Sequence, residues 1–432
     1  MERKLMKALK RWKENPKRMP LLLNGARQVG KTYTALTFGK QYYRNTAYFN
    51  MEDSSEVTAI FARDLDPVRI VNELSIKAGV NIYPDDTLII LDEIQACERA
   101  LTSLKYFCER APQYHIIAAG SLLGVALRRE KYSFPVGKVD RMTLYPLDFE
   151  EFLWATGNER LCALIQESFA SFTPLSLHDT ALDLYKIYLV VGGMPKAVSE
   201  YVETRDFDFV TAAQKTLGDS YIADMAKYAT PQDTTRIMAA WDSVPAQLSK
   251  ENHKFQYKVI KSGARAHEYE TAIDWLKAAG MINICTRVRE GKMPLSAYAD
   301  HDAFKIYMMD TGLLCSKFSI AANVVLHSPH SFDGFKGALA ENYIMQALTV
   351  NGFDPFYWSS PGKAELDFVL QDRGGNILPL EGKSADNVKA KSLRIFVAQY
   401  EPLYAIRVSA KNFGFENNIK SIPLYALFCL KP

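Results

Sequence analysis

The chain has 432 residues, of which 48% are hydrophobic and 23% charged, and its formal net charge is +3. These averages are typical of a folded globular protein and exclude a disordered, collagenous or membrane-embedded chain. A net charge this small does not by itself predict a nucleic-acid partner, so support for one must come from local charge patterns.

No stretch of the chain approaches 18 consecutive apolar residues, and the opening twenty residues lack the apolar core of a secretory signal. We therefore expect a cytoplasmic protein with no membrane partner. The six cysteines are scattered singly and never form a CxxC pair. That spacing predicts neither a zinc site nor a disulfide framework.

The region from Pro20 to about Pro146 alternates short apolar runs with helical stretches. This alternation predicts strands of a parallel sheet joined by crossover helices. Continuous apolar runs are typical of strands that are buried on both faces. The predicted strands are Leu21–Leu23, Ala47–Phe49, Leu88–Leu91 and Ile116–Ala119.

A glycine-rich segment follows the first strand and opens a predicted helix, Tyr33–Tyr42. The segment fits GxxxxGK[ST], in which glycines let backbone N–H groups surround phosphates at a helix N-terminus. Its residues are Gly25, Ala26, Arg27, Gln28, Val29, Gly30, Lys31 and Thr32. We expect the loop to bind ATP, with Lys31 on the β- and γ-phosphates and Thr32 as a ligand of Mg²⁺.

Two acids end the third predicted strand, in the order Asp92 then Glu93. An apolar strand followed by two acids is the Walker B arrangement, in which Asp92 helps to hold Mg²⁺ and Glu93 polarises the attacking water. An acidic N-cap of the next helix is the structural alternative. Beside a phosphate-binding loop, the pair predicts ATP hydrolysis.

The fourth predicted strand ends in Gly120 and Ser121. Because it neighbours both motifs, the Ser121 hydroxyl is expected near the γ-phosphate, where it would act as a sensor of hydrolysis. Ser121 is equally suited to cap the helical stretch 122–128. Both interpretations stay open at this point.

The rest of the chain is predicted to be mainly helical and then mixed. Helical patterns cover 150–164 and 182–203, with a loop at 172–179 between them. Between about Ser220 and Tyr307, short helices followed by two small strands give a winged-helix-like pattern. Those strands are Leu295–Tyr298 and Phe304–Tyr307. A second α/β unit is then predicted from helix Phe335–Val350 and strands Phe356–Trp358, Leu366–Leu370 and Ile377–Leu380.

A run of basic residues in the middle region is spaced by three and four positions: Lys250, Lys254, Lys258, Lys261 and Arg265. On a helix they would share one face, where like charges repel one another. A polyanion would relieve that repulsion, so this face and the neighbouring Phe255 and Tyr257 are a candidate contact with the DNA backbone. A solvated helix face is the common alternative.

Together these strings resemble the AAA+ superfamily, and specifically the prokaryotic ATPases that pair an AAA domain with a C-terminal domain of unknown function. The resemblance covers nearly the whole chain. The matching strings include GARQVGKT at Gly25, LIILDEIQ at Leu88, AAGSLLG at Ala118, LYPLDFEEFL at Leu144 and GGMP at Gly192.

The resemblance implies a helical lid after the ATPase core. In related lids a glycine-proline element touches the nucleotide, which implies that role for Gly193 and Pro195; a plain turn between helices is the alternative. Many AAA+ proteins also place an arginine of a neighbouring subunit on the γ-phosphate. Arg128, Arg129 and Arg141 are unranked candidates for that role.

The C-terminal region carries a second cluster of charged residues: Glu341, Asp367, Glu381 and Lys383. Their order resembles that of PD-(D/E)xK nucleases, in which carboxylates hold a divalent cation and a lysine stabilises developing charge. The resemblance implies metal ligation by Glu341, Asp367 and Glu381, with Lys383 as the stabilising cation. Gly382 departs from the pattern, because an apolar strand residue is usual there. The alternative is a docking or DNA-binding module without cleavage.

We therefore predict an α/β protein with four regions: an AAA+ core (1–150), a helical lid (151–215), a winged-helix-like region (216–325) and a nuclease-like α/β domain (326–432). ATP and Mg²⁺ are the expected cofactors. The predicted function is ATP hydrolysis coupled to DNA binding or processing. The alternative is a nucleotide-dependent switch or scaffold, whose C-terminal modules bind a protein partner or further copies of the chain.

Overall fold

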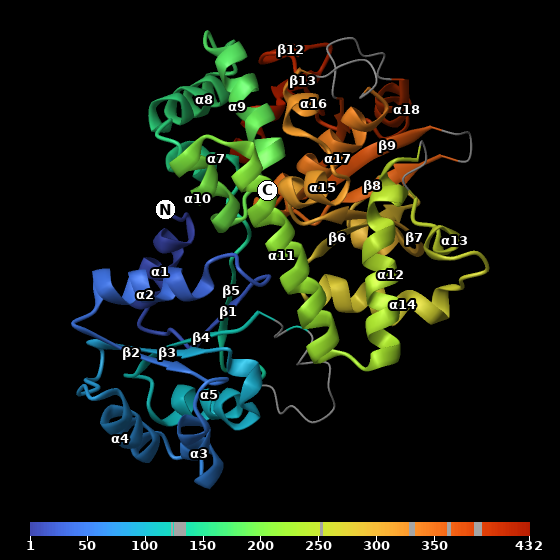
Figure 1. The fold of residues 1–432 in the computed structure, drawn as a ribbon. Coiled ribbons are helices and arrows are strands. Elements are labelled where there is room, and N and C mark those ends of the chain that lie inside the picture. Colours follow the sequence, from blue (N-terminus) through green and yellow to red (C-terminus); the bar gives the residue numbers. More distant parts are fainter. Residues whose placement is uncertain (122–123, 125–134, 251–253, 328–332, 361–363, 384–390) are drawn as a thin grey trace. The chain divides into compact units, whose positions relative to one another are not determined.

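A computed structural model describes residues 1–121, 124, 135–250, 254–327, 333–360, 364–383 and 391–432 (Figure 1). The chain divides into two units, Met1–Tyr145 with Ala278–Gly280, and Pro146–Lys277 with Met281–Pro432. Each unit contains one β-sheet with helices packed against it. The predicted α/β class is therefore confirmed.

The first unit is built on five parallel strands in the order β2-β3-β4-β1-β5. They are β1 (Leu21–Asn24), β2 (Asn45–Asn50), β3 (Thr87–Asp92), β4 (His115–Ala119) and β5 (Asp140–Thr143). The first four match the predicted apolar runs. The sequence pattern did not show β5, because two of its four residues are only partly buried and the other two are exposed.

Helices cover both faces of this sheet (Figure 1). One face carries α1 (Leu5–Glu14) and α2 (Lys31–Tyr42); the other carries α3 (Ser55–Arg63), α4 (Pro67–Ala78) and α5 (Glu98–Arg110). A short 3₁₀ helix, η1 (Ile94–Ala96), precedes α5. Because both faces are covered, the strands have the continuous apolar sequences expected of a buried parallel sheet.

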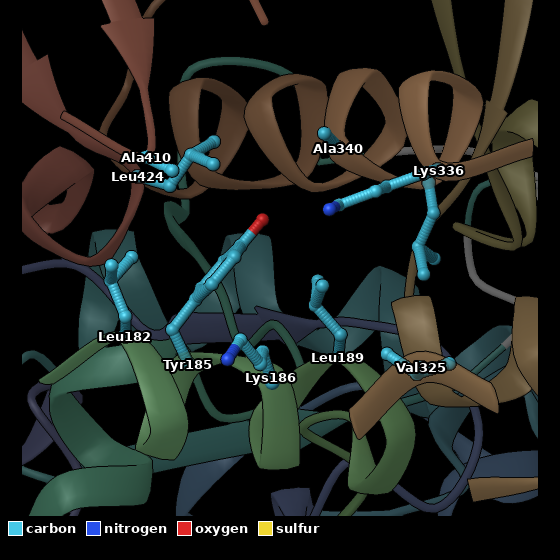
Figure 2. Close-up of a pocket in the computed structure, with 10 residues that line it drawn as sticks. Leu182, Tyr185, Lys186, Leu189, Val325, Lys336, Ala340, Ala410 and Leu424 are labelled. Carbon is cyan, nitrogen blue, oxygen red and sulfur yellow. The ribbon is translucent and has the colours of Figure 1, made fainter. Parts of the chain in front are cut away.

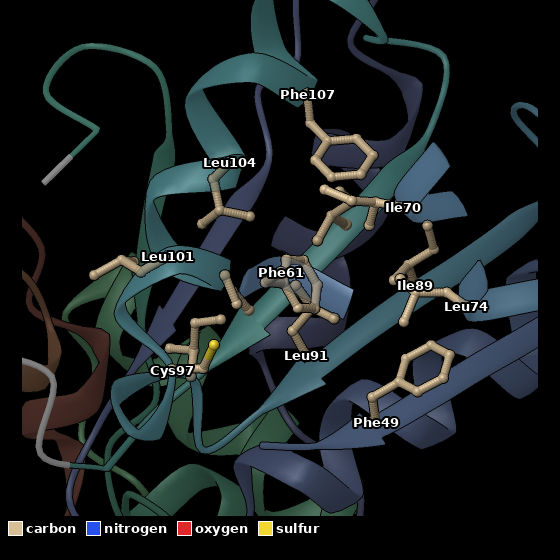
Figure 3. Close-up of a cluster of buried hydrophobic side chains, with 14 of the residues drawn as sticks. Phe49, Phe61, Ile70, Leu74, Ile89, Leu91, Cys97, Leu101, Leu104 and Phe107 are labelled. Atoms are coloured by element: carbon tan, nitrogen blue, oxygen red, sulfur yellow. The ribbon is translucent and has the colours of Figure 1, made fainter. Parts of the chain in front are cut away.

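The core under α3, α4 and α5 is a continuous cluster of apolar side chains (Figure 3). Ile89 and Leu91 of β3 and Phe61 of α3 are each no more than 1% exposed. Burying a side chain of this size stabilises the folded state by about 1.5–3 kcal/mol. The cluster therefore fixes β3, the strand that ends in the acidic pair.

The second unit holds an eight-stranded mixed sheet in the order β12-β13-β11-β10-β9-β8-β6-β7. Its strands are β6 (Ile282–Val288), β7 (Ala299–Met308), β8 (Phe356–Ser359), β9 (Glu365–Gln371), β10 (Ile377–Gly382), β11 (Ala405–Ser409), β12 (Gly414–Glu416) and β13 (Ile419–Pro423). The strands predicted at 304–307, 356–358, 366–370 and 377–380 are confirmed.

The helices of the second unit come mostly before its sheet. They are α7 (Phe149–Ala155), α8 (Glu159–Ser171), α9 (His178–Val191), α10 (Pro195–Thr204), α11 (Phe207–Tyr228), α12 (Pro231–Leu248), α13 (Tyr257–Ile260) and α14 (Ala266–Ala278). Those within or after it are η2 (Leu295–Tyr298), α15 (Thr311–Lys317), α16 (Ala322–His327), α17 (Asp333–Val350), α18 (Lys391–Tyr400) and η4 (Leu424–Cys429). No helix among the described residues has the length and apolar character needed to cross a bilayer.

The predicted winged-helix-like region is corrected in two respects. Leu295–Tyr298 is a 3₁₀ helix and not a strand, because the Ala297 N–H bonds the nearby Pro294 carbonyl at 3.0 Å. In addition, β6 and β7 belong to the eight-stranded sheet, in which β6 pairs with β8 in parallel. The expected boundary between residues 325 and 326 therefore cuts through one sheet.

The basic run does not lie along one helix face. Helix α12 ends at Leu248, α13 has four residues, and the chain turns at Gly263 with φ +81° before α14. Phe255 is 6% exposed and stacks on Phe304 with a ring-centroid distance of 5.2 Å. It is thus a packing residue, and the expected aromatic contact with DNA is wrong at this position.

His115 at the start of β4 gives a testable pH dependence. Its ring is 3% exposed, Nδ1 lies 2.7 Å from the Tyr43 hydroxyl, and Nε2 lies 3.3 Å from Asp85 Oδ1. Burial, followed by the nearby Arg18, lowers the pKa of His115 from 6.5 to about 4. Between pH 6.5 and about pH 4, the imidazole is therefore protonated in the unfolded state and neutral in the folded state.

We expect the contribution of neutral His115 to be complete above pH 6.5 and to fall by about 3 kcal/mol by pH 4. Urea unfolding of wild type and His115→Asn at pH 7, 6, 5 and 4 measures this. The free-energy difference between the two proteins should shrink as the pH falls. A free-energy difference that stays constant from pH 7 to pH 4 would contradict the lowered pKa of His115.

Candidate functional site

The phosphate-binding loop connects β1 to α2 and has the backbone that its glycines permit. Gly25 has φ +146°, and a Cβ there would lie 2.2 Å from the Leu144 carbonyl oxygen. Gly30, the N-cap of α2, has φ +94°, and Gln28 has φ +62°. Only glycine adopts the first of these conformations without a clash. The loop therefore needs Gly25 for both its φ angle and its close approach to Leu144.

The Lys31 side chain lies along this loop. Its Nζ donates to the carbonyl oxygens of Gly25 at 2.9 Å and Ala26 at 2.8 Å, and Lys31 is 6% exposed. Ala26 and Val29 are buried, whereas Arg27 is partly exposed and Gln28 exposed. The ammonium is therefore held beside the α2 N-terminus, where backbone N–H groups favour an anion.

Thr32 and Asp92 meet across the sheet edge. The Thr32 hydroxyl donates to Asp92 Oδ2 at 2.6 Å, and the Tyr48 hydroxyl donates to the same oxygen at 3.0 Å. Asp92 is 4% exposed, and its Oδ1 accepts the Glu93 N–H at 3.0 Å. A hydroxyl and a carboxylate in contact are oxygen ligands of the type that Mg²⁺ prefers.

Glu93 has an unusual backbone and a held carboxylate. Its φ is +48°, a left-handed conformation that costs a non-glycine residue of order 1–3 kcal/mol and is concentrated at functional sites. Glu93 Oε2 accepts from Gln95 Nε2 at 2.6 Å and from the Ser121 hydroxyl at 3.3 Å. The buried Ser121 therefore contacts the predicted water-polarising acid, which supports its interpretation as part of the site.

The sheet order explains why these residues meet. Strand β4 lies between β3 and β1, and all three run in parallel. Their carboxyl ends therefore share one edge, the usual ligand-binding edge of an open α/β sheet. The loop after β1, the acids at the end of β3 and Ser121 after β4 are brought to that edge. The residues fit a nucleotide with Mg²⁺: Lys31 for its phosphates, and Thr32 with Asp92 for the ion.

Three further residues of this site were missed by the sequence prediction. Tyr48 and Gln95 bind the two acids, as described. Arg3 is 6% exposed and donates to the carbonyl oxygens of Val29 at 2.8 Å and Tyr145 at 2.6 Å, so it braces the loop. No motif marks Arg3 or Tyr48. Gln95 is the last residue of the string LIILDEIQ and so had the clearest signal, but the sequence prediction gave it no role. Arg128 and Arg129 lie outside the described residues, and Arg141 lies on β5.

The predicted lid element is a tight turn inside the second unit. The Gly193 N–H donates to Asp310 Oδ2 at 2.6 Å, and a Cβ on Gly193 would lie 1.9 Å from the Leu147 carbonyl oxygen. Pro195 occupies the first turn of α10. Burial raises the pKa of Asp310 to about 6, although backbone N–H groups oppose that shift. The N–H group of Gly193 is therefore already bonded to Asp310. Contact of Gly193 and Pro195 with a nucleotide stays a prediction.

The second cluster of predicted site residues lies on β9 and β10. These strands are antiparallel with Leu380 opposite Phe368, which places Glu381 opposite Asp367 and on the same face. Asp367 Oδ2 accepts the Gly382 N–H at 2.8 Å. Glu381 Oε1 lies 3.1 Å from Lys383 Nζ, while Glu381 Oε2 is buried without a hydrogen-bond partner. The structure thus brings the two acids and the lysine together.

The departure at Gly382 has a packing explanation. A Cβ there would lie 2.4 Å from Cδ1 of Ile344 on α17. Glycine therefore lets this helix approach the strand that carries Glu381. The unusual residue follows from helix-sheet packing and does not separate the two acids.

Glu341 on α17 is bound by an internal cation. Its Oε1 lies 3.1 Å from Lys305 Nζ and also accepts from the Tyr307 hydroxyl. Lys305 is 1% exposed and makes a second ion pair, with Glu365 Oε1 at 2.7 Å. A lysine between the apolar residues of β7 could have indicated a buried ion pair, but the sequence prediction gave Lys305 no role.

These charges act on Asp367. Burial and the Glu341 carboxylate raise the pKa of Asp367 to about 7, while Lys383 and Lys305 oppose the shift. Among the described residues, no group of three or more His, Cys, Asp or Glu side chains is arranged to hold a metal ion. The unpartnered Glu381 oxygen fits a cation beside Asp367, whereas Glu341 is occupied by Lys305 and Tyr307.

Three family models match successive parts of the chain. Residues 17–153 match an AAA domain, residues 182–323 match a domain of unknown function (DUF8612), and residues 336–427 match another (DUF4143). The first segment contains the phosphate-binding loop, Asp92, Glu93 and Ser121. It thus has the motifs and parallel-sheet fold of an AAA-type P-loop ATPase.

Similar proteins include an uncharacterized protein of Methanocaldococcus jannaschii, which is 26% identical over 201 residues, or 43% of this chain. The match spans 40% of the length of that relative. A Walker-type ATPase of Pyrococcus abyssi is 15% identical, with 72% of this chain and 94% of that chain covered and a TM-score of 0.44. The ORC2 protein of Aeropyrum pernix is 13% identical, with 76% and 94% covered and a TM-score of 0.39.

The buried ion-pair group around Lys305 makes a stability prediction. Lys305→Met should lower the free energy of unfolding by about 3–5 kcal/mol, because it leaves buried Glu341 without its counter-ion. Removing both carboxylate charges with Glu341→Gln and Glu365→Gln in the same chain should recover most of that loss. Urea unfolding measures both. Exposed Lys215→Met is the control, and equal stability of the two lysine variants would contradict the prediction.

Proposed function

We propose that the first unit binds ATP with Mg²⁺ and hydrolyses the bond between its β- and γ-phosphates, which releases ADP and phosphate. The observation that carries this proposal is the contact of Thr32 with Asp92 at 2.6 Å, directly beside the loop that holds Lys31. It joins the phosphate-binding segment to the acidic strand end. The match of residues 17–153 to an AAA domain supports the same function.

Each residue has a distinct role in the proposed reaction. Lys31 exchanges the carbonyl oxygens of Gly25 and Ala26 for phosphate oxygens when nucleotide enters. Mg²⁺, held by Thr32 and Asp92, would supply positive charge to the phosphates. Glu93 orients the attacking water and accepts its proton, which is general-base catalysis.

Ser121 and Gln95 position the Glu93 carboxylate. Both donate to Glu93 Oε2, which limits the directions in which the other oxygen can point. Because a general base must lie within hydrogen-bond distance of the water, a loss of this restraint slows hydrolysis without removing ATP binding. Ser121 is thus a positioning residue: it holds the Glu93 carboxylate in place and does not itself act on the water.

We also propose that ATP turnover is coupled to DNA binding or cleavage through the second unit. The support is the unpartnered Glu381 Oε2, which lies on a strand opposite Asp367 and next to Lys383. A buried acceptor without a partner is costly, and a cation would satisfy it. The alternative is a nucleotide switch whose second unit binds protein and cleaves nothing.

The ATPase proposal predicts a separation of binding from turnover. Glu93→Gln should retain ATP affinity and lose roughly 100-fold or more in kcat, because the general base is removed. Lys31→Ala should weaken ATP binding by roughly 10- to 100-fold, since charged hydrogen bonds to phosphate are lost. Ser121→Ala should lower kcat with unchanged affinity.

Fluorescent ATP-analogue titration and phosphate release with Mg²⁺, each repeated with EDTA, measure these effects. Asp86→Asn, an exposed acid just before the amino end of β3, is the matched control and should behave as wild type. Full hydrolysis by Glu93→Gln would contradict the assigned base.

The nuclease proposal predicts nicking of supercoiled plasmid with Mg²⁺ or Mn²⁺. Asp367→Asn should abolish nicking and leave phosphate release intact, because the amide still accepts the Gly382 N–H but cannot ligate the cation as a carboxylate does. Exposed Asp354→Asn is the control.

If the wild type hydrolyses ATP and nicks nothing, the cleavage proposal fails. DNA affinity measured from 50 to 200 mM salt then decides between the two remaining functions. Several neutralised phosphates give a steep inverse dependence on salt, whereas protein docking does not.

A further inference from the structure

The second unit contains a pocket that neither the nucleotide site nor the acidic cluster uses. It lies between α9, α16 and α17, and also borders Ala410 and Leu424 (Figure 2). Its walls are mainly aliphatic, with Leu182 and Leu189 of α9 facing Leu339 and Ala340 of α17. The cavity volume is about 80 Å³, and the space continues into open solvent. The pocket is therefore small, and the end of a bound molecule can extend into the solvent.

A buried hydroxyl without a partner projects into this pocket. Tyr185 is 4% exposed, and its hydroxyl has no hydrogen-bond partner. Its ring is fixed by edge-to-face contact with Tyr343, at a centroid distance of 4.8 Å. Figure 2 shows the hydroxyl directed toward the middle of the pocket. Because an unmade hydrogen bond at a buried hydroxyl is unfavourable, the site is built for an acceptor.

A cation faces the same space. The Lys336 side chain extends from α17 with its ammonium toward the middle of the pocket (Figure 2). Among the described residues, Lys336 forms no ion pair. The other lining lysine, Lys186, is paired with Asp183 at 2.9 Å. No acidic side chain is among the described residues that line the pocket, so Lys336 supplies its uncompensated positive charge.

We propose that this pocket binds a small amphipathic carboxylic acid as its carboxylate. The carboxylate accepts a hydrogen bond from the Tyr185 hydroxyl and forms an ion pair with Lys336, and the hydrocarbon tail lies against the leucines of α9 and α17. Such a ligand satisfies both polar groups and buries apolar surface at the same time. The site is separate from the proposed ATPase and nuclease functions, and its test uses neither activity.

Octanoate is the probe, titrated into the full chain by isothermal calorimetry. We expect one site with Kd on the order of 1 mM or tighter, the scale that ligand efficiency gives for about ten non-hydrogen atoms. Octan-1-ol, which has the same tail without the charge, should bind at least about tenfold more weakly, because it cannot pair with Lys336.

Two variants locate the binding. Lys336→Met keeps an unbranched apolar side chain that is one atom shorter and removes the charge. It should weaken octanoate binding about tenfold without changing the affinity for octan-1-ol. Tyr185→Phe should weaken octanoate and leave the Tm of the empty protein unchanged, since the removed hydroxyl has no partner. Exposed Lys215→Met is the control and should bind as wild type does.

The proposal is overturned if wild type shows no octanoate binding up to about 10 mM, a limit about tenfold above the expected Kd. It is also overturned if octanoate binds wild type, Lys336→Met and Tyr185→Phe equally, because the acid then binds elsewhere. A loss of Tm in Tyr185→Phe would show that the hydroxyl is already bonded, which removes the basis for the acceptor.

Discussion

The hydrogen bond from Thr32 to Asp92 is the contact on which the proposed ATPase site depends. It joins residues 60 positions apart in sequence at a distance of 2.6 Å. That approach requires β4 between β1 and β3, with all three strands parallel. The apolar core under β3 holds that arrangement, so packing on one face of the sheet sets the chemistry at its edge.

Around this contact, hydrogen bonds fix the direction of each charged group. Asp92 accepts from Thr32 and Tyr48, and Glu93 accepts from Gln95 and Ser121. The positive φ of Glu93 shows that the backbone tolerates strain at this position. Such groups are oriented before substrate arrives, which is the condition for electrostatic stabilisation without reorganisation.

The second unit is organised by buried charge. Lys305 reaches Glu341 of α17 and Glu365 of β9, and so ties the strands that precede residue 325 to the sheet that follows it. A buried charge without its partner is strongly destabilising. The strands that carry Lys305 and Glu365 and the helix that carries Glu341 are therefore expected to fold together. The domain-of-unknown-function segments 182–323 and 336–427 therefore contribute to one sheet.

Sequence alone determined the features that are encoded locally: the apolar strands β1 to β4, the phosphate-binding loop with Lys31 and Thr32, and the acids Asp92 and Glu93. These follow from residue type and spacing within a few positions of one another. Tertiary structure decided the rest. Arg3, Tyr48 and Lys305 reach partners 26 to 142 residues away, and a pairing over that range leaves no periodic pattern in the sequence. The basic run shows the same limit, because a turn at Gly263 ends the helix that its spacing implied.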